Sequence, residues 1–365
     1  MKTDQVLRRA CGLRNSSTGL PTTKVPAPVY TTHVFRSQRS SRLFERSQLE
    51  PLARRTFDRQ YSTTRAWSST TDISHKILAT NFYGDDGFGR IRYDEIALGK
   101  DGRRIAKVTI QNSAAGNSLN VSLLQHMTTA FRELSQKDDL RCVILTGDKG
   151  FCTGMHVTEL ANLATPDQAR SLILKVCEAG QAIRETAVPT IAQIEGRCYG
   201  AGLELAASCD FRYALKGTVF AMPEVALGVP SVVQARLLAN IIGWQKTRQL
   251  LLVGNNVDTD IAPSWGLVDY VYPTAELLRF NVLKTAQSIC DNAPLAMKSQ
   301  KRLINYWEEN DLAAGIAASV DAFAGAFEGG AVEPKEYTQR FFVRKQKAKK
   351  DYEARQAIKT ADEKA

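Results

Sequence analysis

The stretch that decides the fold runs from Ile194 to Asp210 and reads IEGRCYGAGLELAASCD. Residues 190–195, which read TIAQIE, lead into it, and Gly200-Ala201-Gly202 precede a segment rich in Leu and Ala. This pattern predicts a strand, a tight turn and then a helix over 200–208. The first turn of such a helix leaves backbone N–H groups free, and its dipole favours negative charge. The turn could therefore cradle a phosphate or hold an oxyanion, although a glycine-rich turn alone is as often purely structural.

A second turn of this kind lies upstream, where residues 145–156 read LTGDKGFCTGMH. The predicted buried strand 142–146 ends in glycines here, so the chain around Gly154 and Met155 could present one more backbone N–H. Two such turns could together bind one thioester oxygen as it becomes an enolate, where preorganised donors matter most. Taken alone, the segment is more simply an ordinary connection between a strand and a loop.

A third segment, residues 220–230, reads FAMPEVALGVP and places Glu224 among apolar residues. Such surroundings should raise the pKa of the carboxyl group, which makes it useful as a proton donor or acceptor. A buried glutamate in a structural salt bridge is an equally good interpretation of this segment by itself.

Short strands alternate with helices along the chain, which predicts an α/β fold with parallel strands. The predicted strands are 104–110, 142–146, 190–195 and 211–214, and the predicted helices are 121–135, 165–186, 200–208, 231–242 and 286–304. Residues 62–95 are polar and contain glycines, so we expect a linker there. The Ala- and Gly-rich residues 312–327 predict a packed helix.

The formal charge of +10 is concentrated at the N-terminal end. Residues 1–70 carry a net charge of +9, which leaves +1 for residues 71–365. A nearly neutral body argues against nucleic-acid binding, so no nucleic-acid partner is expected. The chain has no run of about 18 or more uncharged apolar residues, so no membrane span is expected either. Its 7 cysteines form no Cys-x-x-Cys pair, which indicates neither a zinc site nor a disulfide framework.

The N-terminal residues 1–61 are rich in Arg, Ser and Thr and poor in acidic residues. This composition, without an apolar core segment, is typical of a mitochondrial transit peptide and not of a secretory signal. The pattern Arg59-Gln60-Tyr61-Ser62 resembles a matrix-peptidase cleavage site and predicts Ser62 as the mature N-terminus. We therefore expect a mitochondrial matrix protein; the alternative is a disordered basic tail.

Taken together, the three segments resemble the enoyl-CoA hydratase/isomerase (crotonase) family in order and spacing. Asn117-Ser-Leu-Asn120 and Gly266-Leu-Val-Asp269 match further family motifs, and the resemblance covers roughly residues 100–350. It implies a crotonase-type ββα spiral over 96–290. It also implies a helical C-terminal oligomerisation region, 291–365, that assembles homotrimers or hexamers. The implied substrate is an acyl-CoA thioester, and no metal or redox cofactor is implied, because coenzyme A is part of the substrate.

The resemblance also assigns roles to residues. The two oxyanion-hole N–H groups fall on Met155 and Ala201, and the two catalytic glutamates fall on Glu204 and Glu224. In a hydratase of this family, Glu204 would orient and deprotonate water for attack at the β-carbon, and Glu224 would protonate the α-carbon. The residues assigned to acyl-CoA binding are Met155, His156, Val157, Thr158 and Ala201.

Several positions depart from the family pattern. Met155 replaces the usual Ala, which leaves the backbone N–H in place but could narrow the acyl pocket. His156 replaces a common Asp and is expected to pack or to cap a helix, and Thr158 stands where many members carry a Lys. Residues 228–234 read GVPSVVQ and lack the Gly-rich run of many members, so the acyl group of the substrate is left open.

Retention of both glutamates favours an enoyl-CoA hydratase. The nearest alternative is a 3,2-enoyl-CoA isomerase, which needs a single acid/base near Glu224. An alternative of another class is an RNA-binding member, since one mitochondrial hydratase of this family binds AU-rich RNA through a Lys-rich helix. Here the corresponding helix, 121–135, contains Arg132 and no Lys. A catalytically silent scaffold is disfavoured by the two intact carboxylates.

Overall fold

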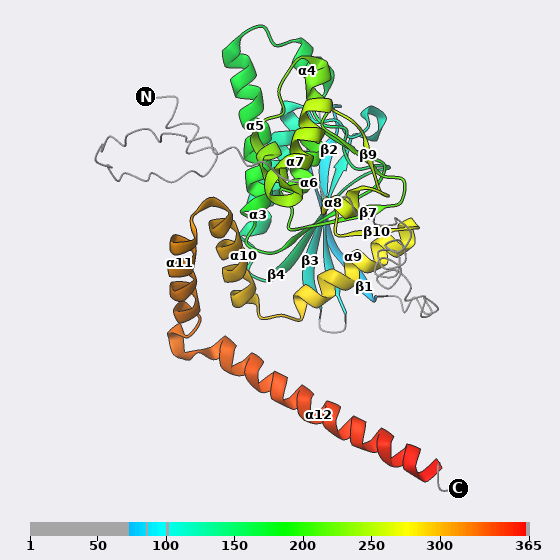
Figure 1. Ribbon diagram of the computed structural model, residues 1–365, viewed down its shortest axis with the longest axis vertical. Helices are drawn as coiled ribbons and strands as arrows, with labels where there is room; N and C mark the ends of the chain where they lie inside the picture. Colours follow the sequence, from blue (N-terminus) through cyan, green and yellow to red (C-terminus); the bar gives the residue numbers. More distant parts are fainter. Residues whose placement is uncertain (1–72, 85–86, 100–101, 363–365) are drawn as a thin grey trace, which may run out of the picture. The chain divides into compact units, whose positions relative to one another are not determined.

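The computed structural model describes residues 73–84, 87–99 and 102–362, whose arrangement is shown in Figure 1. Among these residues, a seven-stranded sheet forms the body. In spatial order its strands are β1 (His75–Tyr83), β2 (Arg90–Leu98), β3 (Arg103–Gln111), β4 (Leu140–Gly147), β5 (Thr190–Ile194), β7 (Phe211–Leu215) and β10 (Tyr270–Tyr272). The first three strands, β1, β2 and β3, pair antiparallel, whereas β3, β4, β5, β7 and β10 run parallel, as the sequence predicted.

A smaller sheet within the described chain consists of β6 (Arg197–Tyr199), β8 (Val219–Ala221) and β9 (Val257–Asp258). Cys152 joins its edge through a parallel bridge to Cys198. After β4, β5 and β7 of the large sheet, the chain adds the Cys152 segment, β6 and β8 to the small sheet. After each strand of the small sheet, the chain continues into a helix or a helical turn. These repeated strand–strand–helix turns form the ββα spiral expected from the sequence.

The described helices begin in different ways, several of them with a capping side chain or with a proline in the first turn. They are α3 (Val121–Ser135), α4 (Val157–Ala161), α5 (Pro166–Arg184), α6 (Ala201–Ala207), α7 (Leu238–Val253), α8 (Ala262–Trp265), α9 (Ala275–Cys290), α10 (Pro294–Glu309), α11 (Leu312–Gly325) and α12 (Val332–Asp362). At α5, Thr165 and Gln168 cap each other's backbone N–H groups in a capping box, and Pro166 occupies the first position. This confirms the predicted start of that helix at residue 165.

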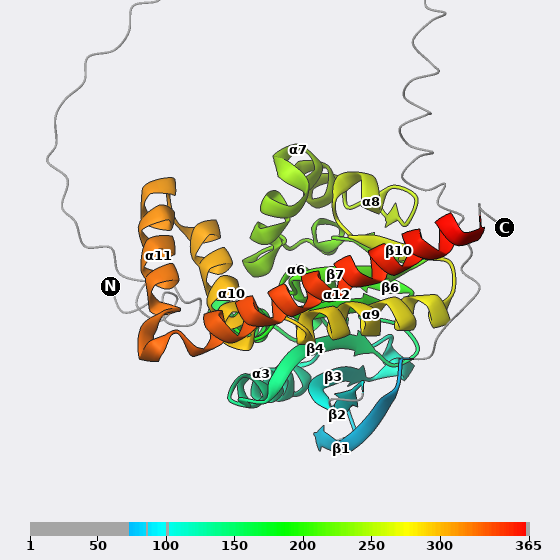
Figure 2. The same ribbon diagram turned by 90° about the horizontal axis from the view of Figure 1, so that it is seen from below.

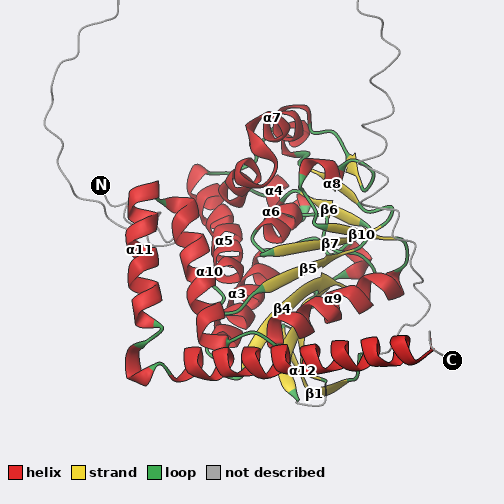
Figure 3. Ribbon diagram, turned by 60° about the horizontal axis from the view of Figure 1, so that its bottom comes forward, coloured by secondary structure: helices red, strands yellow, loops and turns green. Residues whose placement is uncertain are grey.

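Helices cover both faces of the large sheet because successive strand residues point to opposite faces (Figure 3). In β4, Val143 and Leu145 belong to the main core with α3, α5 and α6. Their neighbours Cys142 and Ile144 pack on the other face, against residues of α9. The sheet is therefore buried on both sides, as parallel sheets usually are.

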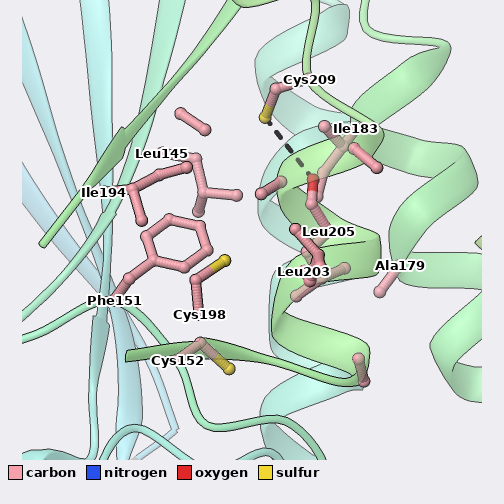
Figure 4. Close-up of a cluster of buried hydrophobic side chains, with 14 of the residues drawn as sticks. Leu145, Phe151, Cys152, Ala179, Ile183, Ile194, Cys198, Leu203, Leu205 and Cys209 are labelled. Carbon is pink, nitrogen blue, oxygen red and sulfur yellow. Dashed lines mark hydrogen bonds between the residues drawn. The ribbon is translucent and has the colours of Figure 1, made fainter. Parts of the chain in front are cut away.

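The main core packs against α6, the helix that follows the glycine-rich turn, and Figure 4 shows part of this core. Phe151 and Ile194 meet Leu203 and Leu205 of α6, with Ile183 of α5 alongside. All seven residues of α6 are buried. A helix enclosed in this way cannot shift without opening the core, so the backbone at its first turn is held rigidly.

The predicted linker over 62–95 is wrong for its described part, because residues 75–83 form β1 and residues 90–95 belong to β2. β1 is an edge strand whose side chains are mostly exposed. A strand that buries almost nothing has no apolar alternation to reveal it. Residues 1–61, including the predicted transit peptide, lie outside the described residues.

Two predicted helices also differ in extent. The helix predicted over 286–304 is interrupted, because α9 ends at Cys290 and α10 begins with Pro294. The helix predicted over 231–242 starts only with a 3-10 segment, Val233–Leu237, that leads into α7. Residues 228–232 before it adopt a non-helical course along the site described below.

The C-terminal region is helical, as expected, but its apolar residues are not packed within the chain. Leu312 and Phe323 of α11 are 81% and 71% exposed, so the predicted packed helix 312–327 is wrong within a single chain. α10 is tied to the body by Arg184, whose guanidinium lies 2.7 Å from the carboxylate of Glu308. Figure 2 shows the α10–α11 pair beside the body and α12 running on from it.

Among the described helices, none is by itself long and apolar enough to cross a membrane. One bent pair, residues 312–325 with 328–353, meets the length and composition criteria jointly.

Candidate active site

The turn before α6 has the backbone geometry that the sequence predicted. Gly200 adopts a φ of +50°, a conformation that L-amino acids rarely adopt, and it forms the N-cap of α6. Ala201 follows as the first helical residue, so its N–H has no partner within the helix. A Cβ at Gly202 would collide with Cys152, so glycine also allows α6 to approach the neighbouring segment closely.

The second predicted turn lies beside the first. Leu119 anchors it, because the N–H of Leu119 donates to the carbonyl of Gly154 (2.8 Å) and the N–H of His156 donates to the carbonyl of Leu119 (2.8 Å). A Cβ placed on Gly154 would lie 3.3 Å from the backbone N of Ala201. Within residues 102–362, neither the Met155 nor the Ala201 N–H donates a hydrogen bond. Two free donors from two turns therefore lie close together.

Glu204 lies one helical turn after Gly200 and is only 4% exposed. Its Oε1 accepts a hydrogen bond from the N–H of Ala235 (3.2 Å). Burial raises the pKa of Glu204 to about 8, and the charge of Glu224 adds to this rise, whereas backbone N–H donors from Ala235 and Val232 oppose it. Near neutral pH this buried carboxyl therefore retains its proton to a large extent.

Glu224 is the first residue of a 3-10 helix, Glu224–Leu227, that follows β8. Its Oε2 accepts a hydrogen bond from the Ser231 hydroxyl (2.9 Å). Its Oε1 faces the first turn, since a Cβ added to Gly200 would collide with that atom. Burial raises the pKa of Glu224, while its backbone hydrogen bond and the Ser231 hydroxyl lower it.

These groups meet in one cavity of about 580 Å³. Met155, Ala201, Glu204 and Glu224 all line it, as the sequence analysis expected of one site. The rest of the wall is mainly aliphatic and comes from α4, α5 and the segment after Glu224. The wall residues include Val157, Leu160, Leu163, Ala169, Leu172, Ile173, Leu227 and Val229.

Two of the residues assigned to acyl-CoA binding lie beside the cavity and not in its wall. His156 is the N-cap of α4, and its Nδ1 accepts a hydrogen bond from the N–H of Thr158 (3.3 Å). The expected capping role of His156 is therefore confirmed. Val157 lines the cavity and Thr158 does not. What these residues bind stays a prediction.

Sequence reasoning missed Ser231, Leu160 of α4 and the aliphatic residues of α5 that complete the cavity. Ser231 lies in the 228–234 segment that departs from the family pattern, and this departure was the available signal. The apolar residues of α5 follow ordinary helical periodicity, which does not distinguish a cavity wall from a core face.

The sequence model of the family described as enoyl-CoA hydratase/isomerase matches residues 100–352. The chain belongs to this family. A curated relative, the short-chain-enoyl-CoA hydratase of Clostridium acetobutylicum, is 31% identical over 70% of this chain and 96% of its own length. The mitochondrial Delta(3,5)-Delta(2,4)-dienoyl-CoA isomerase of Dictyostelium discoideum is 27% identical over 59% of this chain and 78% of its own length.

Solved structures agree with this assignment. The crystal structure of an enoyl-CoA hydratase from Bacillus anthracis superposes with a TM-score of 0.62 at 26% identity and covers 66% of this chain and 93% of that one. The family includes both hydratases and isomerases, so family membership shows a crotonase-type enzyme and leaves the reaction open.

Proposed function

We propose that this protein is an enoyl-CoA hydratase, which adds water across the 2,3 double bond of an acyl-CoA to give a 3-hydroxyacyl-CoA. The observation that carries the proposal is the convergence of two buried carboxyl groups, Glu204 and Glu224, on one cavity with two free backbone N–H groups. Water addition needs one proton acceptor and one proton donor near the same double bond. A pair of carboxyls provides both.

The proposed reaction begins when the thioester carbonyl accepts hydrogen bonds from the N–H groups of Met155 and Ala201. These donors stabilise the negative charge that develops on the oxygen, which makes the β-carbon electrophilic. The water oxygen bonds to the β-carbon, and one water proton passes to the ionised carboxylate. The protonated carboxyl then delivers its proton to the α-carbon. The pair ends with one proton, as it began, but on the other carboxyl group.

The pKa shifts support a pair that holds a single proton near neutral pH. In the site without substrate, burial and the Glu224 charge favour the proton on Glu204. The family resemblance assigns the opposite starting state, with Glu204 as base and Glu224 as acid. We propose that the two carboxyls act as one coupled unit and that the free enzyme starts with the proton on Glu204. The division of roles between them stays a prediction.

We further propose that the acyl group is a hydrocarbon chain longer than four carbons. Cavities of roughly 300–1,000 Å³ hold drug-sized ligands, so about 580 Å³ exceeds the needs of a crotonyl group. Leu163, Leu172 and Ile173 offer aliphatic contacts, and the guanidinium of Arg170 at this wall is paired with Asp167 at 2.7 Å. Each buried methylene contributes about 0.8 kcal/mol, so kcat/KM should rise up to about four-fold per added carbon.

The isomerase reaction is the second candidate, favoured by the isomerase among the relatives. Moving a proton between two carbons of one substrate needs one carboxyl, and the second would have no task. The two activities can be separated on the purified protein. Hydration consumes the enoyl absorbance of a 2-enoyl-CoA, whereas isomerisation creates it from a 3-enoyl-CoA.

The test is a turnover series with straight 2-enoyl-CoA esters of four to twelve carbons, together with a 3-enoyl-CoA. The hydratase proposal expects hydration, with kcat/KM rising to at least about eight carbons. Isomerisation without hydration would refute the hydratase proposal. Hydration that is fastest for the four-carbon ester would refute only the chain-length proposal.

Assembly and location are proposed as well. The exposed apolar residues of α10, α11 and α12 support association into a homotrimer or hexamer, in which copies of these helices would cover one another. The Arg-rich residues 1–61 support import into the mitochondrial matrix. N-terminal sequencing of protein from isolated mitochondria should find Ser62 first; an intact Met1 would contradict cleavage.

A further inference from the structure

Residues 231–235, here termed the carboxylate turn, contact both carboxyl groups of the site. The hydroxyl of Ser231 donates to Oε2 of Glu224 (2.9 Å). The N–H of Ala235 donates to Oε1 of Glu204 (3.2 Å). A single short segment therefore sets the positions of the two groups between which the proposed reaction moves a proton.

The carboxylate turn is itself fixed by the core. The amide Nε2 of Gln234, a buried side chain, donates to the carbonyl of Cys177 on α5 (3.0 Å). Gly180 of α5 provides the space, because a Cβ there would lie 2.6 Å from Cδ of Gln234. Val233 adopts a φ of +42°, which is disfavoured for a β-branched residue. Such backbone strain persists only when the surroundings enforce it, and the buried Gln234 provides that restraint.

The hydrogen bond from Ser231 gives the two carboxylate oxygens of Glu224 different environments. Oε2 is occupied by the Ser231 hydroxyl, whereas Oε1 lies against Gly200, the residue before Ala201. Only Oε1 is thus placed to exchange a proton with a substrate held at the two backbone donors. Loss of the Ser231 hydroxyl would release Oε2 and allow the carboxyl group to rotate.

We propose that Ser231 is a positioning residue that holds Glu224 with Oε1 toward the thioester, and that the contact of Gln234 with Gly180 holds the turn in place. The proposal rests on the proposed hydratase function. It adds a residue from the segment in which this chain departs from the Gly-rich run of its family.

The test replaces the hydroxyl in the full-length protein. Ser231→Ala should lower kcat roughly ten-fold, as expected for a lost hydrogen bond to a charged group, and change KM by less than about two-fold. The acidic limb of the kcat/KM profile should move up by on the order of one pH unit, because the ionised form of Glu224 loses a donor. Ser231→Thr should restore most of kcat. Ser288→Ala on α9, which removes an exposed hydroxyl, is the matched control.

A remote variant tests how the turn is held. Gly180→Ala places a methyl group against Gln234, and it touches neither carboxyl group. It should lower kcat several-fold at nearly constant KM, with circular dichroism unchanged. Wild-type kinetics in Gly180→Ala would overturn the role of the α5 contact, and wild-type kcat and pH profile in Ser231→Ala would overturn the role of Ser231.

A measurement without substrate separates this proposal from the hydratase assignment. Infrared difference spectra over a pH titration report the protonation of buried carboxyl groups, and the signal lost in Glu224→Gln identifies Glu224. Ser231→Ala should shift the midpoint of that signal upward. An unchanged midpoint would refute the positioning role even if no turnover is found. An absence of hydration by the wild-type protein would refute the hydratase proposal and leave the infrared result standing.

Discussion

Two regions of this chain use apolar residues in opposite ways. Around the site, every residue of α6 is buried, and its apolar side chains pack against the sheet and α5. In the C-terminal helices, large apolar side chains such as Leu312, Phe323 and Val332 are 70–81% exposed. The apolar side chains of the first region are packed against other residues of the same chain, whereas those of the second region are not.

This difference in burial indicates that the first region is rigid and that the second is a surface for association. A first turn enclosed by core packing can hold backbone donors and carboxyls at fixed positions, which catalysis needs. An apolar helix surface left in water carries a free-energy cost that a second copy of the same surface could remove. We therefore expect chemistry from the first region and assembly from the second.

The largest effect should come from removing one backbone donor in the buried region. Ala201→Pro deletes the N–H at the first position of α6, where proline is sterically tolerated. Loss of one oxyanion donor should reduce kcat by roughly 10²–10³-fold in hydration assays. Ala275→Pro at the same position of α9 is the matched control. If a folded Ala201→Pro enzyme turns over like the wild type, Ala201 does not belong to the site.

The next effect should appear in the exposed region. Phe323→Asp on α11 replaces an exposed ring by a charge, and burying such a ring is worth about 1.5–3 kcal/mol. Light scattering at micromolar concentration should find a trimer or hexamer for the wild type and smaller species for the variant. Asp321→Lys, on the same helix, should leave the mass unchanged. A monomeric wild type would remove the assembly proposal.

The buried pair should also give a characteristic pH dependence. The one-proton state is active, so kcat/KM should follow a bell-shaped curve whose alkaline limb lies near the pKa of about 8 for Glu204. Above that limb the rate should fall about ten-fold per pH unit as the last proton is lost. A flat profile between pH 6 and 10 would show that the pair does not share a proton.

The last effect concerns stability. The pKa of Glu204 is higher in the folded chain, about 8, than its ordinary value of 4.5. The proton is therefore held more tightly by the folded chain, and this contribution to stability is lost as pH rises from 4.5 toward 8. Glu204→Gln cannot ionise, so its stability does not fall over this pH range. Relative to the wild type, its free energy of unfolding should be higher by a few kcal/mol at most at pH 8 and almost unchanged at pH 4.5. Thermal melts at both pH values measure it. Equal differences at both would contradict the raised pKa.

Local patterns in the sequence predicted the parallel α/β body, and the family resemblance implied the spiral and the groups at the cavity. Gly200, Ala201 and Glu204 lie in one strand–turn–helix unit, and apolar periodicity places α3 and α5. The sequence could not predict the hydrogen bond of Ser231 to Glu224, because that contact depends on a strained turn fixed by α5. It missed β1, since an edge strand with exposed side chains carries no alternation. It also predicted a packed helix over 312–327, because composition does not tell whether the partner lies in the same chain.

The most direct test of the account compares hydration and isomerisation in Glu204→Gln and Glu224→Gln, with Glu178→Gln on α5 as the control carboxylate. Each site variant should lose at least about 10²-fold in crotonyl-CoA hydration, the lower end of what acid–base groups contribute. Glu204→Gln should spare any 3-enoyl-CoA isomerisation far more than hydration, because one carboxyl still moves a proton between carbons. If Glu204→Gln hydrates like the wild type, the reaction does not need both carboxyl groups and the two-carboxyl mechanism is wrong. If the wild type isomerises without hydrating, the chain is an isomerase and the hydratase proposal is wrong.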